Sequence, residues 1–460
     1  MGRNTGLPDS DLSGNQEDSY NYFITSLNIS AHPLLKKAGK RKLSYFSVLE
    51  YLVNSCVLDT EYANARLLQY RSLLAGEETV TSLRKNDSAN AIRTIVDDFL
   101  KPWKRGNSSI LLCDIALILL HKPRVKKACG MIAKFLGKRK QAKLNELFTA
   151  LYDNRPIPRM FANVENLINQ FRLNRDFSAR PEMRILVTAN VSTGKSTLIN
   201  ALVGKPVTKT SQEICTKNLC FIYNKPFEDY RFHLIAPPLN LDASYDDLFS
   251  AGKEANCVIA SYFRVSGHPN ARVCLIDTPG FNSAVFSAHR KITRKAIAEE
   301  NYDKLICVLN ADKIGTNETI RHLKYIHRKV PNEKVIFVLN KLDDFRNEED
   351  SIPESIEGVK ADLRKIGYKN PVICPFSAYF SLLLKRKRND EELSDNERDV
   401  FNYVAKKFSR PEYDLSKYYN MVFEDGIQNN DELAKLDHIS GLYGLENILY
   451  GGQENEKSVH

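Results

Sequence analysis

The sequence predicts an α/β fold in which a mostly parallel sheet flanked by helices follows an all-helical N-terminal region. Polar segments at 189–197, 277–280, 340–343 and 377–378 each follow a short apolar run. Open α/β sheets place their ligands beyond the carboxyl ends of such strands. The stretches between the runs supply the helices that connect parallel strands. Before residue 180, apolar residues instead recur at helical spacing.

The chain of 460 residues divides into four parts. Residues 1–19 are rich in Ser, Asn, Asp and Gly without periodicity, which predicts a mobile tail. We expect the helical region over residues 20–180, the α/β domain over residues 181–452 and a C-terminal tail over residues 453–460. The hydrophobic content of 43% is enough to build the cores of these domains.

The helical region is predicted from apolar faces. Apolar residues recur at helical spacing within residues 48–52, 67–74, 92–100 and 161–171, and Pro102 is an expected helix stop. No repeat of fixed period is present. We therefore expect a short bundle that packs partly on the α/β domain.

A phosphate-binding loop is predicted after the first apolar run of the α/β domain. The pattern G-x-x-x-x-G-K-[ST] is met except that Ala189 replaces the first glycine, which we expect to strain the loop without abolishing it. Lys195 would reach the β- and γ-phosphates, and Ser196 would hold Mg²⁺. The expected nucleotide-binding residues are Asn190, Ser192, Thr193, Gly194, Lys195, Ser196 and Thr197.

A second phosphate-sensing segment follows the apolar run 273–276. Its residues are Asp277, Thr278, Pro279 and Gly280. The aspartate could hold Mg²⁺ through water, and the N–H of Gly280 could sense the γ-phosphate. The alternative is a common turn, because Asp, Pro and Gly are turn formers.

Two segments predict recognition of guanine. The first comprises Asn340, Lys341 and Asp343, at the end of the run 335–339. The Asp343 carboxylate could accept two N–H groups that guanine offers and adenine does not, while the lysine stem covers the base. The second comprises Ser377 and Ala378, where a backbone N–H could meet the guanine carbonyl oxygen.

As a set, these motifs resemble those of P-loop GTPases of the translation-factor-related class, and among these the dynamin-like GTPases of bacteria are most similar. The resemblance covers about residues 182–452. Residues 212–217 precede an apolar strand as the first switch of that family does, which implies that Thr216 closes over Mg²⁺ and the γ-phosphate. Ser192 matches a P-loop serine of the family, and residues 438–448 resemble the closing helix of its GTPase domain.

The resemblance implies a Mg²⁺-dependent GTPase. Its expected catalytic residues are Ser192, Lys195, Thr216 and Gly280, and its expected metal ligands are Ser196, Thr216 and Asp277. Residues 277–280 match the second switch of the family. Two positions depart from it, because Val191 in the phosphate loop and Phe281 directly after the second-switch glycine are apolar where a water-positioning glutamine could stand. We therefore hypothesise slow hydrolysis that is raised by dimerisation through the GTPase domain, by a monovalent cation near Ser192 or by a partner. The alternative is a GTP-gated interaction module with little turnover that acts on a protein or ribosomal RNA partner.

Part of the net charge of +10 is concentrated in two basic segments, residues 122–143 and residues 385–388. Charge runs are usually solvated surface, which is the first interpretation. The alternative for residues 122–143 is an anionic membrane, with each basic residue contributing roughly 1 kcal/mol. Nucleic acid is less expected, because no RNA-binding motif is present.

The resemblance also raises a question about membrane remodelling. Dynamin-like proteins that remodel membranes continue into a helical stalk, but only about ten residues follow residue 450. Either the N-terminal helices do a related job, a separate stalk-bearing protein supplies it, or membrane scission is not the function.

We expect a cytoplasmic protein that is peripheral if it meets a membrane. The apolar stretch 110–120 is interrupted by Asp114 and is too short to cross a bilayer, and the N-terminus lacks a signal-peptide core. No disulfide framework or zinc site is expected, and the three cysteines in apolar strands, Cys274, Cys307 and Cys374, are predicted to be buried. His322 and His327 are interpreted as solvent-exposed.

Overall fold

The computed structural model describes residues 22–57, 61–74, 76, 107–190, 192–208, 218–235, 239–250, 256–268, 271–280, 287–311, 316–346, 350–419 and 431–451. The predicted tail 1–19, the first switch 212–217 with Thr216, and the two apolar positions Val191 and Phe281 lie outside these residues.

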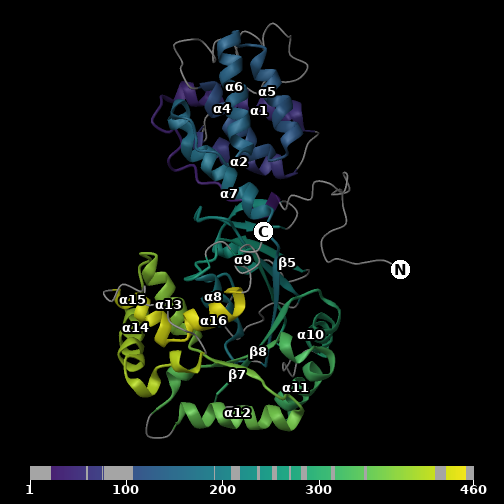
Figure 1. Cartoon of the computed structure of the whole chain (residues 1–460), viewed down its shortest axis with the longest axis vertical. Helices are drawn as coiled ribbons and strands as arrows, with labels where there is room; N and C mark the ends of the chain where they lie inside the picture. The colour runs from purple at the N-terminus through teal and green to yellow at the C-terminus, as the bar shows by residue number, and fades with distance from the viewer. Residues whose placement is uncertain are drawn as a thin grey trace. The chain divides into compact units, whose positions relative to one another are not determined.

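The chain forms two compact units (Figure 1). The first contains residues 1–180 together with residues 225–243, and the second contains residues 181–224 and 244–460. Residues 225–243 therefore belong to the helical unit, although they lie within the segment predicted for the α/β domain. They carry the antiparallel strands β3 (Phe232–Leu234) and β4 (Asn240–Ala243).

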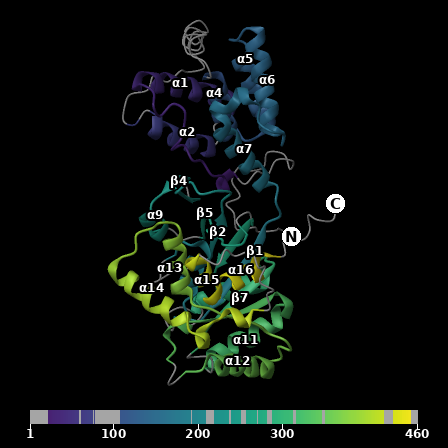
Figure 2. The same cartoon turned by 60° about the vertical axis from the view of Figure 1, so that its left-hand side comes forward.

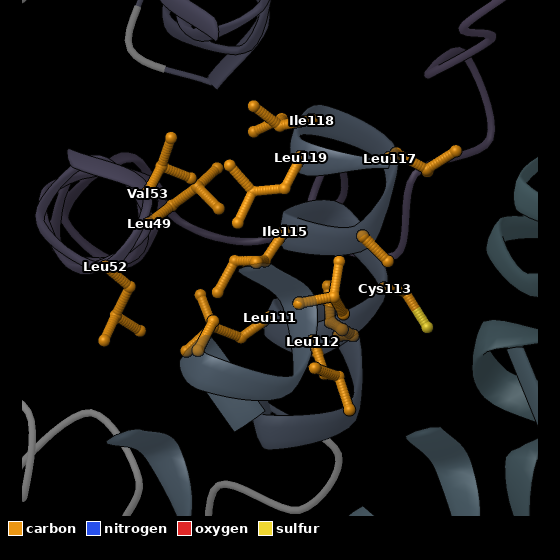
Figure 3. Packing of buried hydrophobic residues seen from close by; sticks show 14 of the residues in the cluster. Leu49, Leu52, Val53, Leu111, Leu112, Cys113, Ile115, Leu117, Ile118 and Leu119 are labelled. Carbon is orange, nitrogen blue, oxygen red and sulfur yellow. The ribbon is translucent and has the colours of Figure 1, made fainter. Parts of the chain in front are cut away.

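The helical unit is built around one buried helix. Its described helices are α1 (Gly39–Cys56), α2 (Glu61–Leu74), α4 (Asn107–Leu119), α5 (Lys122–Ala133), α6 (Lys138–Tyr152) and α7 (Glu165–Ser178). Twelve of the thirteen residues of α4 are buried. Figure 3 shows Leu49 and Val53 of α1 directed toward Ile115 and Leu119 of α4. The apolar stretch that the sequence places at 110–120 is thus the central helix of this core.

Asp114, the residue that interrupts this stretch, has partners inside the core. It is fully buried and accepts hydrogen bonds from the hydroxyls of Tyr45 and Tyr70. His32 Nε2 lies 2.9 Å from the same carboxylate. A buried carboxylate is tolerable only with such partners. Among the described helices, none is long and apolar enough to span a membrane.

The second unit has the predicted α/β architecture. Its strands are β1 (Met183–Ala189), β2 (Cys220–Asn224), β5 (Cys257–Ser261), β6 (Val273–Asp277), β7 (Lys304–Asn310), β8 (Val335–Asn340) and β9 (Val372–Pro375). They lie in the order β5-β2-β6-β1-β7-β8-β9, with the pair β2–β6 antiparallel and the other pairs parallel. Figure 2 shows β5, β2, β1 and β7 in this unit. The predicted fold class is confirmed, and so is the burial of the three strand cysteines.

Helices cover the sheet in two groups. The first contains α8 (Lys195–Val203), which packs on α13 (Ala378–Arg388), and continues with α14 (Asp395–Phe408), α15 (Glu432–Ile439) and α16 (Leu442–Tyr450). The second contains α10 (Ser287–Glu299), α11 (Asn317–Lys329) and α12 (Ile352–Ile366), each packed on the next. Figure 1 shows α13 and α10 on opposite sides of β7 and β8. The short helix α9 (Tyr245–Ser250) precedes β5.

The basic segment 385–388 is solvated surface only in part, because Lys387 and Arg388 are exposed whereas Lys385 is buried. Lys385 is 1% exposed, donates to the carbonyl of Leu202 at 2.8 Å and pairs with Glu446 at 2.5 Å. Arg386 pairs with Glu391 and Glu397, and Arg388 pairs with Asp437. These ion pairs join α13 to α14, α15 and α16.

The two histidines of α11 are not solvent-exposed either. His322 is buried, and its Nε2 lies 3.1 Å from Thr188 Oγ1. His327 is half-buried; its Nδ1 lies 3.1 Å from Asn332 Oδ1, and its ring packs on Tyr368. The buried face of α11 comprises Thr319, His322, Leu323 and Ile326.

Candidate nucleotide-binding site

The phosphate loop connects β1 to α8. Its backbone takes the left-handed conformation at Ser192, with φ of 63°, and at Gly194, with φ of 87°. A Cβ at position 194 would lie 2.3 Å from Asn340 Nδ2, so a glycine is required there. Ala189 is a fully buried strand residue without positive φ, and the non-glycine residue of the described loop with left-handed backbone is Ser192.

Lys195 and Asp277 form a buried ion pair at the phosphate end of the site. The lysine opens α8 and the aspartate closes β6. Their side chains are 9% and 1% exposed, and Lys195 Nζ donates to Asp277 Oδ1. Burial raises the pKa of Asp277, and the lysine charge opposes this shift. The pair therefore brings together two motifs that lie 82 residues apart.

The oxygen atoms around this pair fit a magnesium ion. Asp277 Oδ2 is buried and has no hydrogen-bond partner in the described part of the chain. Ser196, whose hydroxyl is a hard oxygen donor, follows Lys195 in the first turn of α8 and is half-buried. Carboxylate and hydroxyl oxygens are ligands that Mg²⁺ accepts. Ser196 and Asp277 could hold this ion, and Thr216, the third expected ligand, lies outside the described residues.

Asn340 connects the phosphate loop to the base-recognition segments. Its Nδ2 donates to the carbonyl of Thr193 at 3.0 Å. Its Oδ1 accepts the backbone N–H of Ala378 at 3.0 Å. Asn340 is 2% exposed, so both bonds are shielded from water. One amide side chain thus fixes three of the predicted motifs relative to one another. A guanine carbonyl would compete with Asn340 for the N–H of Ala378.

Asp343 is oriented by the side chain of Ser377, a residue of the other segment predicted to recognise guanine. Ser377 donates its hydroxyl to Asp343 Oδ1 at 2.7 Å. Burial raises the pKa of Asp343, while this hydrogen bond lowers it. Lys407 of α14 donates to the backbone carbonyls of Asp343 and Phe345. Lys341 has φ of 69°, so the chain turns sharply before the aspartate. Lys407 could not be found from the motifs, because it lies 64 residues further along the chain.

Further hydrogen bonds hold the phosphate loop and the segment 277–280 in place. Asn190 Nδ2 donates to Thr319 Oγ1 at 3.2 Å, and Thr193 Oγ1 donates to the carbonyl of Asn190 at 2.9 Å. Thr278 Oγ1 donates to the carbonyl of Val187 at 2.9 Å. These bonds attach the loop to α11, and the second switch to β1.

Asn200 holds Thr208, the last described residue before the first switch. Its Oδ1 accepts the N–H of Thr208 and its Nδ2 donates to the Thr208 carbonyl, both at 2.9 Å. Residues 209–217 follow directly. Thr197 and Gly280, the remaining predicted site residues that the structure describes, are both half-buried.

Residues 185–342 match a family model described as Dynamin family. The match covers less than half of the chain and shows that this part of it is similar to the dynamin family. The matched residues include the phosphate loop, both switches, Asn340 and Lys341.

A curated relative is a "Probable transmembrane GTPase FZO-like, chloroplastic" from Arabidopsis thaliana. It is 26% identical over 301 residues, which cover 55% of this chain and 29% of that protein. The chain thus spans less than a third of the relative that it matches.

The chain is also similar to two solved structures. One is Toc33 from Arabidopsis thaliana in complex with GDP and Mg²⁺. The other is described as "Dimerization is important for the GTPase activity of chloroplast translocon components atToc33 and psToc159". The first is 14% identical with a TM-score of 0.29 and covers 43% of this chain and 71% of its own. The second is 16% identical with a TM-score of 0.30 and covers 44% and 73%.

Proposed function

We propose that the chain is a Mg²⁺-dependent GTPase of dynamin-like type whose nucleotide state is coupled to self-association or to a membrane or protein partner. The observation that carries the nucleotide assignment is the double hydrogen bond of Asn340 to Thr193 and Ala378. It draws the phosphate loop and the guanine-recognition segments to one edge of the sheet. The match to the dynamin family supports GTP over other nucleotides. The narrower likeness to bacterial proteins stays a prediction.

The phosphate end supplies charge and orientation. Lys195 would exchange its buried partner Asp277 for the β- and γ-phosphates, and Asp277 would then be available to the metal. Bound Mg²⁺ would neutralise negative charge that develops on the phosphates. Ser192, Gly280 and Thr216 keep their predicted roles around the transferred phosphate. In phosphoryl transfer, positioning and electrostatics provide nearly all of the catalysis.

The helical unit would respond to the nucleotide state through a segment of chain that it shares with the nucleotide-binding unit. The first switch runs into β2, and the chain then enters the helical unit at residue 225. Inside that unit, Asp229 accepts the N–H of Leu27 at 3.0 Å, and Ser26 donates to the carbonyl of Phe227 at 2.6 Å. A shift of the switch would therefore be passed along β2 into a segment that is anchored to helical-unit residues.

A basic surface on α5, α6 and their connection could meet an anionic membrane. We define the basic surface as its exposed residues Lys122, Lys126, Lys127, Lys134, Lys138, Arg139, Lys140 and Lys143. Of the apolar residues between them, Ile132 and Leu136 are buried in the bundle core, whereas Phe135 is half-buried and packs against it. Contact would therefore be mainly electrostatic and peripheral. A cytoplasmic location is part of this proposal.

The deciding experiment is GTP hydrolysis as a function of protein concentration, with and without anionic liposomes. Lys195→Ala provides the blank, because the variant cannot neutralise the phosphates. A rate per molecule that climbs with concentration or lipid supports a self-associating GTPase. Absence of both GTP binding and turnover in the folded wild-type protein would overturn the proposal.

Base recognition has a separate test. Asp343→Asn replaces a pair of acceptors by an amide that also donates, so affinity should move from guanosine to xanthosine triphosphate. Ser377→Ala is the companion variant, because it removes only the hydroxyl that orients Asp343. Unchanged GTP affinity in Asp343→Asn would refute the assignment of this residue.

A GTP-gated module with little turnover is the second candidate. The apolar residues Val191 and Phe281 favour it, since neither can orient an attacking water. Single-turnover hydrolysis, measured with and without potassium, separates the candidates. Tight GTP binding with a flat, near-zero rate under all conditions would select the gated module, whereas acceleration by potassium would support a cation near Ser192.

A further inference from the structure

A cavity lies between α10 and α11, at residues that belong to none of the nucleotide motifs. Its empty volume is about 390 Å³, including the part that opens to solvent. The lining residues are Arg290, Thr293, Arg294, Glu318, Arg321 and His322. Three guanidinium groups thus line one cavity between two adjacent helices, and solubility alone does not require this arrangement.

The cavity is positively charged. Among the described residues that line it, three are arginines and one, Glu318, carries a carboxylate. His322 adds no charge at neutral pH, because burial lowers its pKa to about 3 and the nearby Arg294 acts in the same direction. Glu318 stands in the first turn of α11, where the positive end of the helix dipole offsets part of its charge. The balance therefore favours an anion.

The arginines are also free to bind. Arg290 and Arg321 are exposed, and neither forms an ion pair with the residues that the structure describes. Arg294 lies over the ring of Tyr325 at 5.0 Å, a cation–π contact that fixes its direction without a carboxylate partner. By contrast, Arg386 and Arg388 of α13 are engaged by carboxylates.

The floor of the cavity is bonded to the nucleotide site. Thr293 Oγ1 donates to the carbonyl of Pro279 in the second switch at 2.8 Å. His322 Nε2 lies 3.1 Å from Thr188 Oγ1 in the strand that leads into the phosphate loop. A ligand that moved α10 against α11 would therefore act directly on both phosphate-sensing segments.

We propose that this cavity binds a phosphomonoester group and that its occupancy changes the rate of nucleotide release. Guanidinium groups present planar pairs of donors that match phosphate oxygens. The site goes beyond the proposed GTPase function, because the guanine nucleotide already has its own phosphate loop. The phosphomonoester could belong to a soluble metabolite or to a lipid headgroup.

The test uses full-length protein saturated with GDP and Mg²⁺, so that the phosphate loop is filled. Glycerol 3-phosphate is titrated by calorimetry, and release of a fluorescent GDP analogue is timed at saturating glycerol 3-phosphate. The double variant Arg290→Gln, Arg321→Gln should bind about tenfold more weakly or worse, the loss expected when about 1.4 kcal/mol of charge-assisted bonding is removed. Arg328→Gln, an exposed arginine of α11 outside the cavity, is the matched control.

The expected result is binding by wild type and Arg328→Gln, with an altered GDP release rate that the double variant lacks at an unchanged Tm. Equal weakening in Arg328→Gln would reduce the effect to general surface charge and overturn the site. Binding without any change in GDP release would overturn the coupling. No binding of glycerol 3-phosphate or of phosphatidic acid vesicles would overturn the proposal, and so would tighter binding of an aspartate-rich peptide.

Vesicles distinguish the source of the phosphomonoester. Phosphatidic acid carries this group, whereas phosphatidylserine offers negative charge without it. Preference for phosphatidic acid over phosphatidylserine at equal charge, lost in the double variant, would assign the site to a lipid headgroup. Binding of free glycerol 3-phosphate without such a preference would assign it to a soluble metabolite. GTP hydrolysis measured in parallel tests the nucleotide site independently.

Discussion

The two basic segments of this chain have similar compositions and opposite surroundings. The basic surface of α5 and α6 is exposed, whereas in the run 385–388 the first lysine is fully buried and both arginines are paired. The difference lies in the partners, because residues of the second run form ion pairs with Glu446, with Asp437 and with acidic residues after α13. Local charge density therefore says little about whether a segment is available to a ligand.

The largest loss of stability is expected at Lys385, the buried residue of the run 385–388. Lys385→Met leaves the buried Glu446 carboxylate without its cation and should lower the free energy of unfolding by about 3–5 kcal/mol. Urea denaturation followed by circular dichroism measures this. Lys385→Met combined with Glu446→Gln should recover much of the loss. A single variant as stable as wild type would contradict the buried ion pair.

A pH-dependent effect of intermediate size is expected at His322. Its pKa is lowered to about 3 in the folded protein, against an ordinary value of 6.5, so the unfolded chain binds a proton that the folded chain does not. Stability that is present above pH 6.5 is therefore lost as the pH falls toward 3. Between pH 7 and pH 4.5 the loss should be roughly 2–3 kcal/mol. His322→Gln should lack this increment in denaturation measured at both pH values, and an identical pH slope in the variant would count against it.

A smaller loss is expected at Arg388, whose side chain is 32% exposed while its partner Asp437 is 2% exposed. Arg388→Gln should cost about 1–2 kcal/mol, because solvent screens the arginine but the aspartate stays buried. Lys387→Gln is the neighbouring control. Lys387 is exposed and lies over the ring of Phe401, so its loss should be within about 1 kcal/mol. Equal losses of stability in Arg388→Gln and Lys387→Gln would show that pairing with Asp437 makes no difference.

The smallest effect on stability is expected on the basic surface. Reversing Lys126, Lys127, Lys138 and Arg139 to glutamate should change stability by less than about 0.5 kcal/mol per site, as exposed substitutions usually do. The same variant should lose co-sedimentation with anionic liposomes, whereas reversal of Lys406 and Arg410, exposed on and just after α14, should not. Liposome binding that survives in the first variant would refute the membrane assignment.

The fold could be predicted because its signals are local. Each motif follows its own strand, and strands that run parallel bring their carboxyl ends to one edge of the sheet. The double hydrogen bond of Asn340 could not be predicted, because it joins residues that are 147 positions apart and leaves no spacing pattern. The same holds for Lys407, which reaches Asp343 from another helix.

Two of the errors had a signal that could have corrected them. His322 lies on the same helical face as Thr319, Leu323 and Ile326, so its burial follows from the apolar neighbours and not from the spacing of the two histidines. Lys385 shares a face with the buried Ala378 and Ser381 of α13. In both cases the helix face decided burial; the spacing of the two histidines misled for His322, and the charge run misled for Lys385.

The return of residues 225–243 to the helical unit gives the two units three covalent crossings, near residues 180, 224 and 243. Lys225 and Asp229 form an ion pair that is fully shielded from water, and the His233 ring touches both Lys225 and the carbonyl of Phe23. A recombinant fragment that starts at residue 181 would keep this ion pair but lose the helices around it. It should therefore be prone to aggregation, so the units of this protein cannot be separated by a single cut.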